Sequence, residues 1–256
     1  NFGSLRIILY ARAKLPLLGM VSREEQRIDE RTTKMNEKID FFSDGPNTIY
    51  EDYKIAFDPK TGCRCDIPIK PTTITSYDEL AKRVFDHNDV ESFVDKKLKE
   101  SLAFQQWRKL MPSATPRSIA DYQKAYKTAN LQMVDIDVRN YGLQLPSGQV
   151  LFHGGNLSSG ILRRPLSLTF CPQVARQEAL WKGKAVSNGF LGIYKITIIG
   201  SSAVGFVFRQ RGTSLGNEKE VLVASGIPLQ IGPVIYEEMI DGLQWRIFDA
   251  TLGLED

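Results

Sequence analysis

The stretch LGNEKEVLV, residues 215–223, places three charged side chains directly before an apolar run. Residues 221–223 are typical of a buried strand that the chain enters through a Gly-Asn turn. Side chains alternate along an extended chain, so Glu218 and Glu220 share one face of this strand and Lys219 takes the other. Two carboxylates on one face repel, which can raise the pKa of one of them. Alone, the pattern is more typical of a solvated strand end than of a functional site.

The rest of the chain after about residue 145 has the same strand-like texture. Short runs of β-forming residues are bounded by Gly, Ser and Pro. One helix interrupts them, CPQVARQEALWKGKA (171–185), with Pro172 suited to its first turn. Many short strands with one embedded helix predict a compact sandwich of the α+β class. The strand segments are QVLFHGG (149–155), PLSLTF (165–170), GFLGIYKITII (189–199), AVGFVF (203–208), KEVLVASG (219–226), LQIGPVIYEEMI (229–240) and LQWRIFDATL (243–252).

The first half of the chain has helical signals instead. Ser22 and Ser76 each precede a Glu at the capping-box position, which predicts helices in SREEQRIDERTTKMNEKIDFF (22–42) and SYDELAKRVFDH (76–87). Apolar spacing predicts one amphipathic helix over residues 90–111, and residues 113–136 indicate another that begins near Ser118. The Gly-, Pro- and Thr-rich segment 57–76 predicts a loop or short hairpin. We therefore expect a helical N-terminal lobe over residues 1–115 and a compact core over 116–256.

Composition narrows the class of protein. The 256 residues are 42% hydrophobic and 25% charged, which is ordinary for a soluble globular protein. A net charge of +3 is too mild to favour nucleic acid as a partner. Cys63, Cys65 and Cys171 form an odd, sparse set that suits a reducing compartment, and no second Cys or His pair follows at metal-ligand spacing. We expect no metal.

Neither a membrane span nor a dinucleotide-binding loop is predicted. No stretch reaches the roughly 20 apolar residues that a membrane helix needs. No G-x-G-x-x-G opens a helix, and there is no Walker lysine loop. The chain begins with Asn1 rather than Met, so we expect that an upstream segment, with any targeting signal in it, has been removed.

Polar residues lie near the ends of three predicted strands. His153 ends VLFHGG and is followed by two glycines, which would let a ligand approach the backbone closely. Ser167 and Thr169 share one face of PLSLTF, just before the turn into the embedded helix. Glu218 and Glu220 complete the set. Each run alone can be explained by ordinary structure. Together and in this order, the three runs have one shared explanation.

This ordered set resembles the mono-ADP-ribosyltransferase toxins and effectors. The motifs of that family are an aromatic-Arg-Gly or aromatic-His-Gly strand end, a Ser-Thr-Ser strand followed by a helix, and a Glu-x-Glu strand. They correspond here to Phe152-His153-Gly154, Ser167-Leu168-Thr169 and Glu218-Lys219-Glu220. The resemblance covers roughly residues 118–250. It implies that the core is an ADP-ribosyltransferase-like sandwich of two sheets.

The resemblance also implies a substrate, NAD⁺, and a role for each motif. In such enzymes the bond between nicotinamide and ribose breaks and leaves positive charge on the sugar, as in glycoside hydrolysis. Glu220 would stabilise that charge, and Glu218 would orient or deprotonate the acceptor. Ser167 would hold Glu220 and the nicotinamide ribose. The other implied NAD⁺-binding residues are Phe152, His153, Gly154 and Thr169, and Arg163 and Arg164 are candidates for the pyrophosphate.

Two residues depart from the pattern of the family. Leu168 replaces the middle Thr, but it points to the opposite face of the strand and should have little effect. The second departure is His153. The branch with paired Glu normally has Arg at the place of His153, and His there belongs to the diphtheria-like branch, which has a single Glu. Histidine cannot make the forked contacts of a guanidinium. The placement of NAD⁺ and the acceptor therefore stay open: arginine is the first choice, and threonine, cysteine, asparagine or a nucleic-acid base are alternatives.

Three functions remain after these observations. The first is transfer of ADP-ribose from NAD⁺ to a target protein of a host cell, by a secreted bacterial effector that acts in the host cytosol. The second is NAD⁺ glycohydrolysis, in which water takes the sugar. The third is a non-catalytic module that keeps the fold and binds a partner through the helical half. The carboxylate pair and Ser167 favour an enzyme, because a scaffold has no physical need for them.

Overall fold

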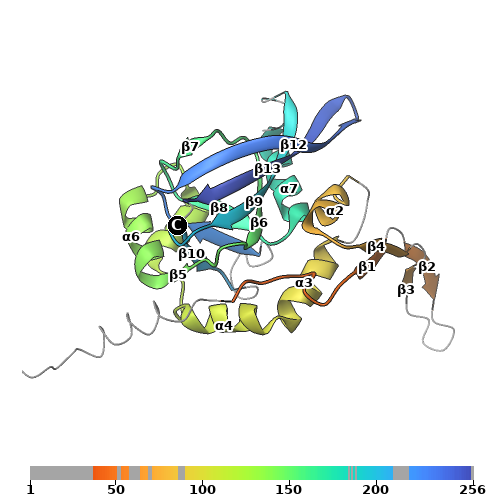
Figure 1. The fold of residues 1–256 in the computed structure, drawn as a ribbon, viewed down its shortest axis with the longest axis horizontal. Coiled ribbons are helices and arrows are strands. Elements are labelled where there is room, and N and C mark those ends of the chain that lie inside the picture. Colours follow the sequence, from red (N-terminus) through yellow and green to blue (C-terminus); the bar gives the residue numbers. More distant parts are fainter. Residues whose placement is uncertain are drawn as a thin grey trace, which may run out of the picture. The chain divides into compact units, whose positions relative to one another are not determined.

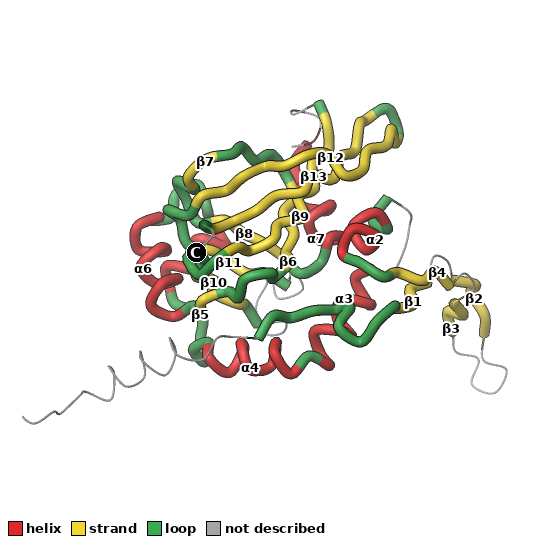
Figure 2. Tube along the Cα trace, in the orientation of Figure 1, coloured by secondary structure: helices red, strands yellow, loops and turns green. Residues whose placement is uncertain are grey.

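Nine strands of the described chain are hydrogen-bonded into one mixed sheet (Figures 1 and 2). All neighbouring strands are antiparallel except one central pair, which runs parallel. That parallel pair is β9 (Phe190–Ile199) and β13 (Leu243–Gly253). In order across the sheet the strands are β5 (Leu143–Gln144), β10 (Val204–Val207), β11 (Glu220–Val223), β8 (Leu166–Thr169), β6 (Val150–Gly154), β9, β13, β12 (Pro228–Ile240) and β7 (Gly160–Ile161).

The computed structural model describes residues 37–50, 53–57, 64–68, 71–85, 90–183, 185, 187, 189–209 and 219–254. The chain from Met35 to Asp256 forms one compact unit. All seven strand segments predicted after residue 145 are strands, and the embedded helix is α7 (Pro172–Leu180), with Pro172 in its first turn. Helices and a large sheet confirm the α+β class.

The expected two sheets take the form of one continuous hydrogen-bonded ladder. Its two halves meet between β6 and β8, which pair at a single position, Phe152 opposite Thr169. On one side of this junction β8 pairs with β11 over four residues. On the other side β6 pairs with β9 over five. Residues of the first two motifs therefore form the junction between the two halves of the sheet.

The described helices before the sheet are α2 (Tyr77–Lys82), α3 (Val90–Glu100), α4 (Leu102–Leu110), α5 (Arg117–Ala125) and α6 (Leu131–Tyr141). Two small antiparallel pairs precede or flank α2: β1 (Asn47–Tyr50) with β4 (Pro71–Ile74), and β2 (Tyr53–Phe57) with β3 (Arg64–Pro68). The Gly- and Pro-rich segment 57–76, predicted as a loop or short hairpin, contains β3 and β4, and each of them pairs with a strand that starts before the segment, β2 and β1.

Two long helices expected from the sequence are each divided by a residue that caps the second part. Ser101 adopts an extended conformation, and its hydroxyl accepts a hydrogen bond from the Phe104 N–H, so α4 starts anew after α3. Asn130 does the same for Met133 at the start of α6. The prediction of one helix over 90–111 and one over 113–136 was therefore wrong, because apolar spacing continues across a side-chain cap.

The first two predicted helices have different outcomes. Ser76 caps α2 as expected and accepts a hydrogen bond from the Glu79 N–H. The Glu79 side chain accepts from Thr75 rather than from the cap residue. Most of the helix predicted over residues 22–42 lies outside the described residues, and its last part, residues 37–42, is not helical.

The helices α3 and α4 share a hydrophobic core with the sheet. Phe104 and Trp107 of α4 contact Phe170, directly after β8, at ring-centroid distances of 5.7 and 6.1 Å. Val94 and Leu98 of α3 are fully buried in the same core. The expected boundary near residue 115 therefore falls between elements that are packed into one core.

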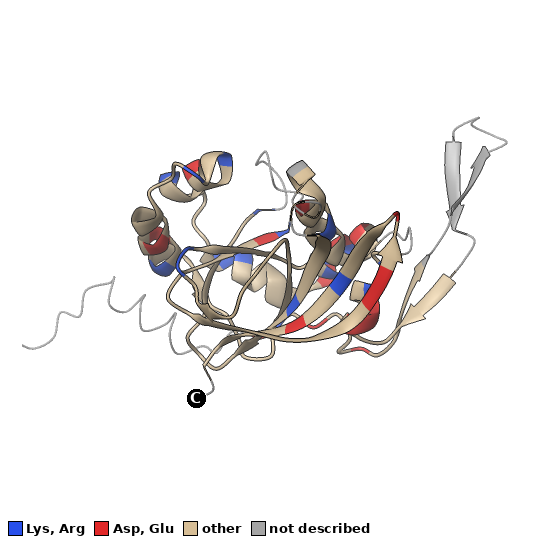
Figure 3. Ribbon diagram, turned by 90° about the horizontal axis from the view of Figure 1, so that it is seen from above, with Lys and Arg blue, Asp and Glu red and all other residues tan. Residues whose placement is uncertain are grey.

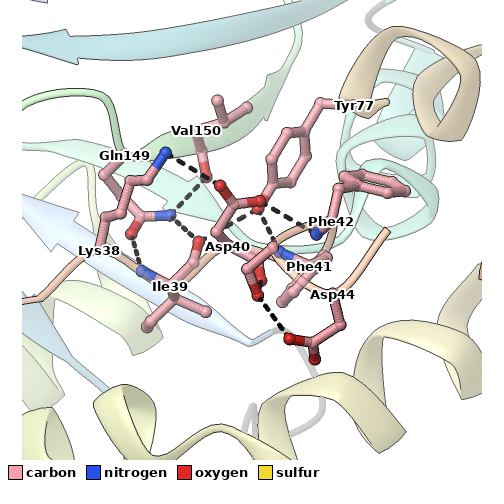
Figure 4. A network of polar contacts seen from close by, with 10 residues as sticks. Lys38, Ile39, Asp40, Phe41, Phe42, Asp44, Tyr77, Gln149 and Val150 are labelled. Carbon is pink, nitrogen blue, oxygen red and sulfur yellow. Dashed lines mark hydrogen bonds and ion pairs between the residues drawn. The ribbon is translucent and has the colours of Figure 1, made fainter. Parts of the chain in front are cut away.

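Residues 37–42 belong to no helix or strand, and their backbone forms hydrogen bonds with two side chains, one from just before β6 and one from α2 (Figure 4). The Gln149 amide accepts a hydrogen bond from the Ile39 N–H at 2.8 Å and donates one to the Ile39 carbonyl at 3.2 Å. The Tyr77 hydroxyl accepts from the Phe41 N–H and donates to the same Ile39 carbonyl. Ile39 and Phe41 are 2% and 3% exposed, so these backbone groups depend on Gln149 and Tyr77 for their partners.

We predict that Gln149→Leu lowers the free energy of unfolding by about 1–3 kcal/mol, because it leaves the buried Ile39 N–H without a partner, whereas the Ile39 carbonyl keeps the Tyr77 hydroxyl. Chemical denaturation measures this change, and amide exchange at Ile39 should accelerate. Gln106→Leu, at an exposed position on α4, is the control. Equal stability of the two variants would contradict the role of the Gln149 amide.

Candidate active site

The pairing of β8 with β11 brings the second and third motifs together. In this antiparallel register Thr169 lies opposite Glu220 and Ser167 lies opposite Leu222. The Ser167 hydroxyl donates a hydrogen bond to Oε1 of Glu220 at 2.7 Å. A diagonal contact of this kind is within reach of side chains on neighbouring strands. Residues 53 positions apart in the sequence thus form one polar pair.

The Glu220 carboxylate has a second donor that the sequence did not indicate. Gln123, on α5, donates from its amide nitrogen to Oε2 of Glu220 at 2.6 Å. Glu220 itself is only 6% exposed. Two hydrogen bonds to a carboxylate favour its ionised form and offset part of the cost of burial.

Burial nevertheless has the largest effect on the Glu220 side chain. It raises the pKa of this carboxyl above its ordinary value of 4.5, and the hydrogen bonds from Ser167 and Gln123 act in the opposite direction. The negative charge of Glu178, on α7, adds to the rise. A carboxylate with a raised pKa in a polar pair is typical of a functional site.

Ser167 also contacts the first motif. The His153 ring nitrogen Nδ1 lies 2.8 Å from the Ser167 carbonyl oxygen. Because a carbonyl only accepts, Nδ1 carries the proton in this contact. The His153 ring is also tilted against Tyr194, with centroids 6.3 Å apart. One serine therefore links the histidine of the first motif, through its backbone, to the carboxylate of the third, through its side chain.

Lys219 points away from this pair, but strand alternation does not explain its direction, because Lys219 precedes β11 and its backbone is not extended. Its ammonium contacts Glu91 at 2.8 Å and Asp95 at 3.2 Å, both on α3, and its side chain is 1% exposed. Burial is the largest single effect and lowers the pKa of Lys219, but the hydrogen bond to Glu91 and the nearby negative charges together raise this pKa above its ordinary value. Its φ of 51° is unusual for a residue other than glycine. A buried ion pair thus ties the start of β11 to α3.

Three other predicted NAD⁺-binding residues have structural partners. Thr169 is buried, and its hydroxyl accepts from the Cys171 N–H at the turn into α7. Phe152 is fully buried in the core beneath α7 and has no exposed surface. A Cβ on Gly154 would lie 1.6 Å from the Ala175 carbonyl oxygen, so this glycine is needed for the close approach of α7.

The remaining candidates are Glu218, Arg163 and Arg164, of which the structure describes only the two arginines. Glu218 lies outside the described residues, so its place relative to Glu220 stays a prediction. Arg163 and Arg164 are exposed, and the Arg164 guanidinium lies 5.9 Å from the centre of the Tyr126 ring on α5. The Arg164 side chain therefore lies near the C-terminal end of α5, the helix that carries Gln123.

Charge is mixed over the described elements, and Figure 3 shows basic and acidic positions on the same helices and strands. Within the described ranges no group of three or more His, Cys, Asp or Glu could hold a metal ion. Among the described helices, none combines the length and the apolar composition of a membrane-spanning segment. An open hollow of about 700 Å³ lies beside β12 and β13, lined among others by Ser159, Gln230 and Thr251, and none of the predicted site residues lines it.

No family model and no curated protein matches the chain. Solved structures do. The ADP-ribosylating toxin BECa of a C. perfringens binary enterotoxin, solved with NADH, is 15% identical, with a TM-score of 0.44 over 81% of this chain and 56% of that one. Vis from Vibrio splendidus, an ADP-ribosyltransferase solved with agmatine, is 12% identical, with a TM-score of 0.33 over 68% of this chain and 86% of that one.

A third structure is an ADP-ribosyltransferase toxin from Paenibacillus larvae, which is 11% identical, with a TM-score of 0.40 over 63% of this chain and 96% of that one. These three proteins are of the class that the motifs resemble. This chain spans little more than half the length of the C. perfringens toxin. The chemistry of this chain is therefore argued from its own residues.

We predict that Glu220→Gln unfolds at a higher temperature than the wild type at pH 7. The folded state raises the pKa of Glu220 above 4.5 and so binds its proton more tightly than the unfolded state. The stability that the wild type gains from this is complete below the unfolded pKa and is lost as pH rises through the folded one. The advantage of the variant should therefore shrink between pH 7 and pH 4.

Thermal unfolding at both pH values measures this difference, and Glu100→Gln, at the exposed end of α3, is the control. A difference between Glu220→Gln and the wild type that does not change with pH would contradict the burial of a charge at this position.

Proposed function

We propose that this protein transfers ADP-ribose from NAD⁺ to a side chain of a target protein and releases nicotinamide. The observation that carries the proposal is the 2.7 Å hydrogen bond from Ser167 to the buried carboxylate of Glu220. A buried acid costs stability unless it is partnered, and the fold retains one where the neighbouring strands β6, β8 and β11 bring residues of the three motifs together. Such a cost is typical of a functional site.

The proposed reaction begins at the sugar. The bond between the ribose C1′ and the nicotinamide nitrogen breaks, and its electron pair leaves with the nicotinamide, whose ring becomes neutral. The ribose is left with positive charge, which the ionised Glu220 stabilises. A lone pair of the acceptor then forms the new bond to C1′, and Glu218 takes the proton that the acceptor releases.

Ser167 and His153 prepare this site in the proposal. Ser167 orients the Glu220 carboxylate through Oε1. His153 holds the backbone at Ser167 and presents its ring toward the adenosine side or the carboxamide of NAD⁺. Phe152, Gly154 and Thr169 act on NAD⁺ indirectly, since their contacts fix the strand ends and α7.

Arginine is the proposed acceptor, because its guanidinium offers a nitrogen nucleophile that a carboxylate pair can orient, and threonine is the alternative. The partner is a protein of a host cell, and the chain acts there as a secreted bacterial effector in the reducing cytosol. The helices before residue 115 would choose the target, since lobes beside a catalytic core commonly recognise the partner.

Two other functions remain testable. An NAD⁺ glycohydrolase would use Glu220 in the same way but pass the sugar to water. A non-catalytic module would need neither the buried carboxylate nor its two donors, so the bonded Glu220 supports an enzyme over a module.

The test is incubation of the protein with labelled NAD⁺ and a cell lysate. We expect label on a discrete protein band, and we expect Glu220→Gln to lower both labelling and nicotinamide release at least about 100-fold, the scale of a lost charge-stabilising group. Glu100→Gln should retain the wild-type rate. Nicotinamide release without a labelled band would identify a hydrolase, and the absence of both would leave the binding module.

A second variant separates the two glutamates. Glu218→Ala should spare nicotinamide release more than transfer, because only the acceptor step uses Glu218. Parallel assays of released nicotinamide and of labelled protein give the two rates. Equal loss of both activities would refute the division of roles.

A further inference from the structure

The contact between Gln123 and Glu220 belongs to none of the three motifs. The Gln123 amide nitrogen lies 2.6 Å from Oε2 of Glu220, and the two residues are 97 positions apart. A carboxylate only accepts, so the amide presents its NH₂ group. A short hydrogen bond to a charged group is among the stronger ones in proteins.

The backbone of α5 places Gln123 firmly. The neighbouring Tyr122 is buried, and its hydroxyl donates to the Pro165 carbonyl at 3.1 Å, one residue before β8. The Ser118 hydroxyl, one turn earlier, contacts Asp137 of α6 at 2.5 Å. These contacts fix α5 to the start of the strand that carries Ser167 and to α6. The packing of α5 therefore places Gln123 opposite Glu220.

The two donors leave little of the carboxylate for a ligand. Oε1 accepts one hydrogen bond from Ser167 and Oε2 accepts one from Gln123, and because Glu220 is only 6% exposed, its remaining lone pairs have little open surface. The proposed reaction needs this carboxylate against the ribose. Ser167 belongs to the strand framework, whereas the Gln123 amide is at the end of a flexible side chain that is only partly buried. Gln123 is the donor that a ligand can displace.

We propose that Gln123 is a positioning residue that closes the site in the absence of NAD⁺: its amide takes the place on Oε2 that a ribose hydroxyl takes when the dinucleotide binds. This inference rests on the proposed function. The amide favours the ionised form of the buried carboxylate and aligns it in the free protein. When NAD⁺ binds, a ribose hydroxyl replaces the amide as the hydrogen-bond donor, so the carboxylate has a partner both before and after binding.

The charge around Glu220 sets the expected titration. Glu178 faces it from α7, Tyr122 lies near it on α5, and Arg164 acts on Tyr122 from the segment before β8. The Gln123 hydrogen bond lowers the pKa of Glu220 against the effect of burial. Removal of the donor should therefore raise the pKa of Glu220 further in the free protein.

Two variants separate the effect of the hydrogen bond that Gln123 donates from the effect of its side chain covering Glu220. Gln123→Met keeps the length and helix propensity of the side chain and removes the donor, and Gln123→Ala removes both donor and cover. Calorimetric titration with NAD⁺ should show both variants binding roughly five- to tenfold more tightly than the wild type, since the ligand no longer displaces a hydrogen bond to a charged group. Gln132→Ala, at an exposed position on α6, should bind as the wild type does.

Carboxyl-carbon NMR of the ligand-free proteins gives the second measurement, in which the Glu220 pKa should rise in both Gln123 variants and stay unchanged in Gln132→Ala. Unchanged or weaker binding in Gln123→Met, or tighter binding in Gln123→Ala alone, would overturn the inference and leave the proposed function intact. A wild-type protein that binds no NAD⁺ would overturn both.

Discussion

The hydrogen bond between Ser167 and Glu220 depends on the register of β8 and β11, and the surrounding structure is arranged to keep that register. A shift of one residue would turn Ser167 to the other face of the sheet and leave a buried carboxylate without its donor. The start of β11 is tied to α3 through Lys219 and Glu91. Just beyond its other end, Ser225 is held by Asp135 of α6 through its N–H and its hydroxyl.

In this arrangement α3, one of the helices before the sheet, stabilises the strand that carries Glu220. Lys219 is buried only because Glu91 and Asp95 neutralise it, and a buried cation without partners would be strongly destabilising. The helix α3 that carries these carboxylates shares its core with Phe170 and the sheet. The helix α3, from the expected helical lobe, is thus part of the framework that holds Glu220.

The strands could be predicted because their signals are local: alternation and bounding Gly and Pro. The contact between Ser167 and Glu220 spans 53 residues and was implied only by the family resemblance, through the order of the motifs. The breaks at Ser101 and Asn130 could not be predicted, since a serine or asparagine in an apolar pattern becomes a cap only when the chain turns there. Gln123 gave no signal, because a single glutamine on a helix is ordinary. Its meaning depends on a contact across 97 residues.

The contact between His153 and Ser167 offers a structural reason for histidine at this position, where the paired-Glu branch of the family has arginine. His153 uses Nδ1 to hold the Ser167 carbonyl, so the first motif acts on the second through the backbone while the second acts on Glu220 through its side chain. An imidazole is rigid and short enough for this bond from a strand end, whereas a guanidinium carries its donors on a long stem. Histidine at this position therefore favours a fixed strand junction over a forked contact with the ligand. The junction is the single pair, Phe152 with Thr169, at which the two halves of the sheet meet, so a histidine that stiffens it also stabilises the geometry of the carboxylate.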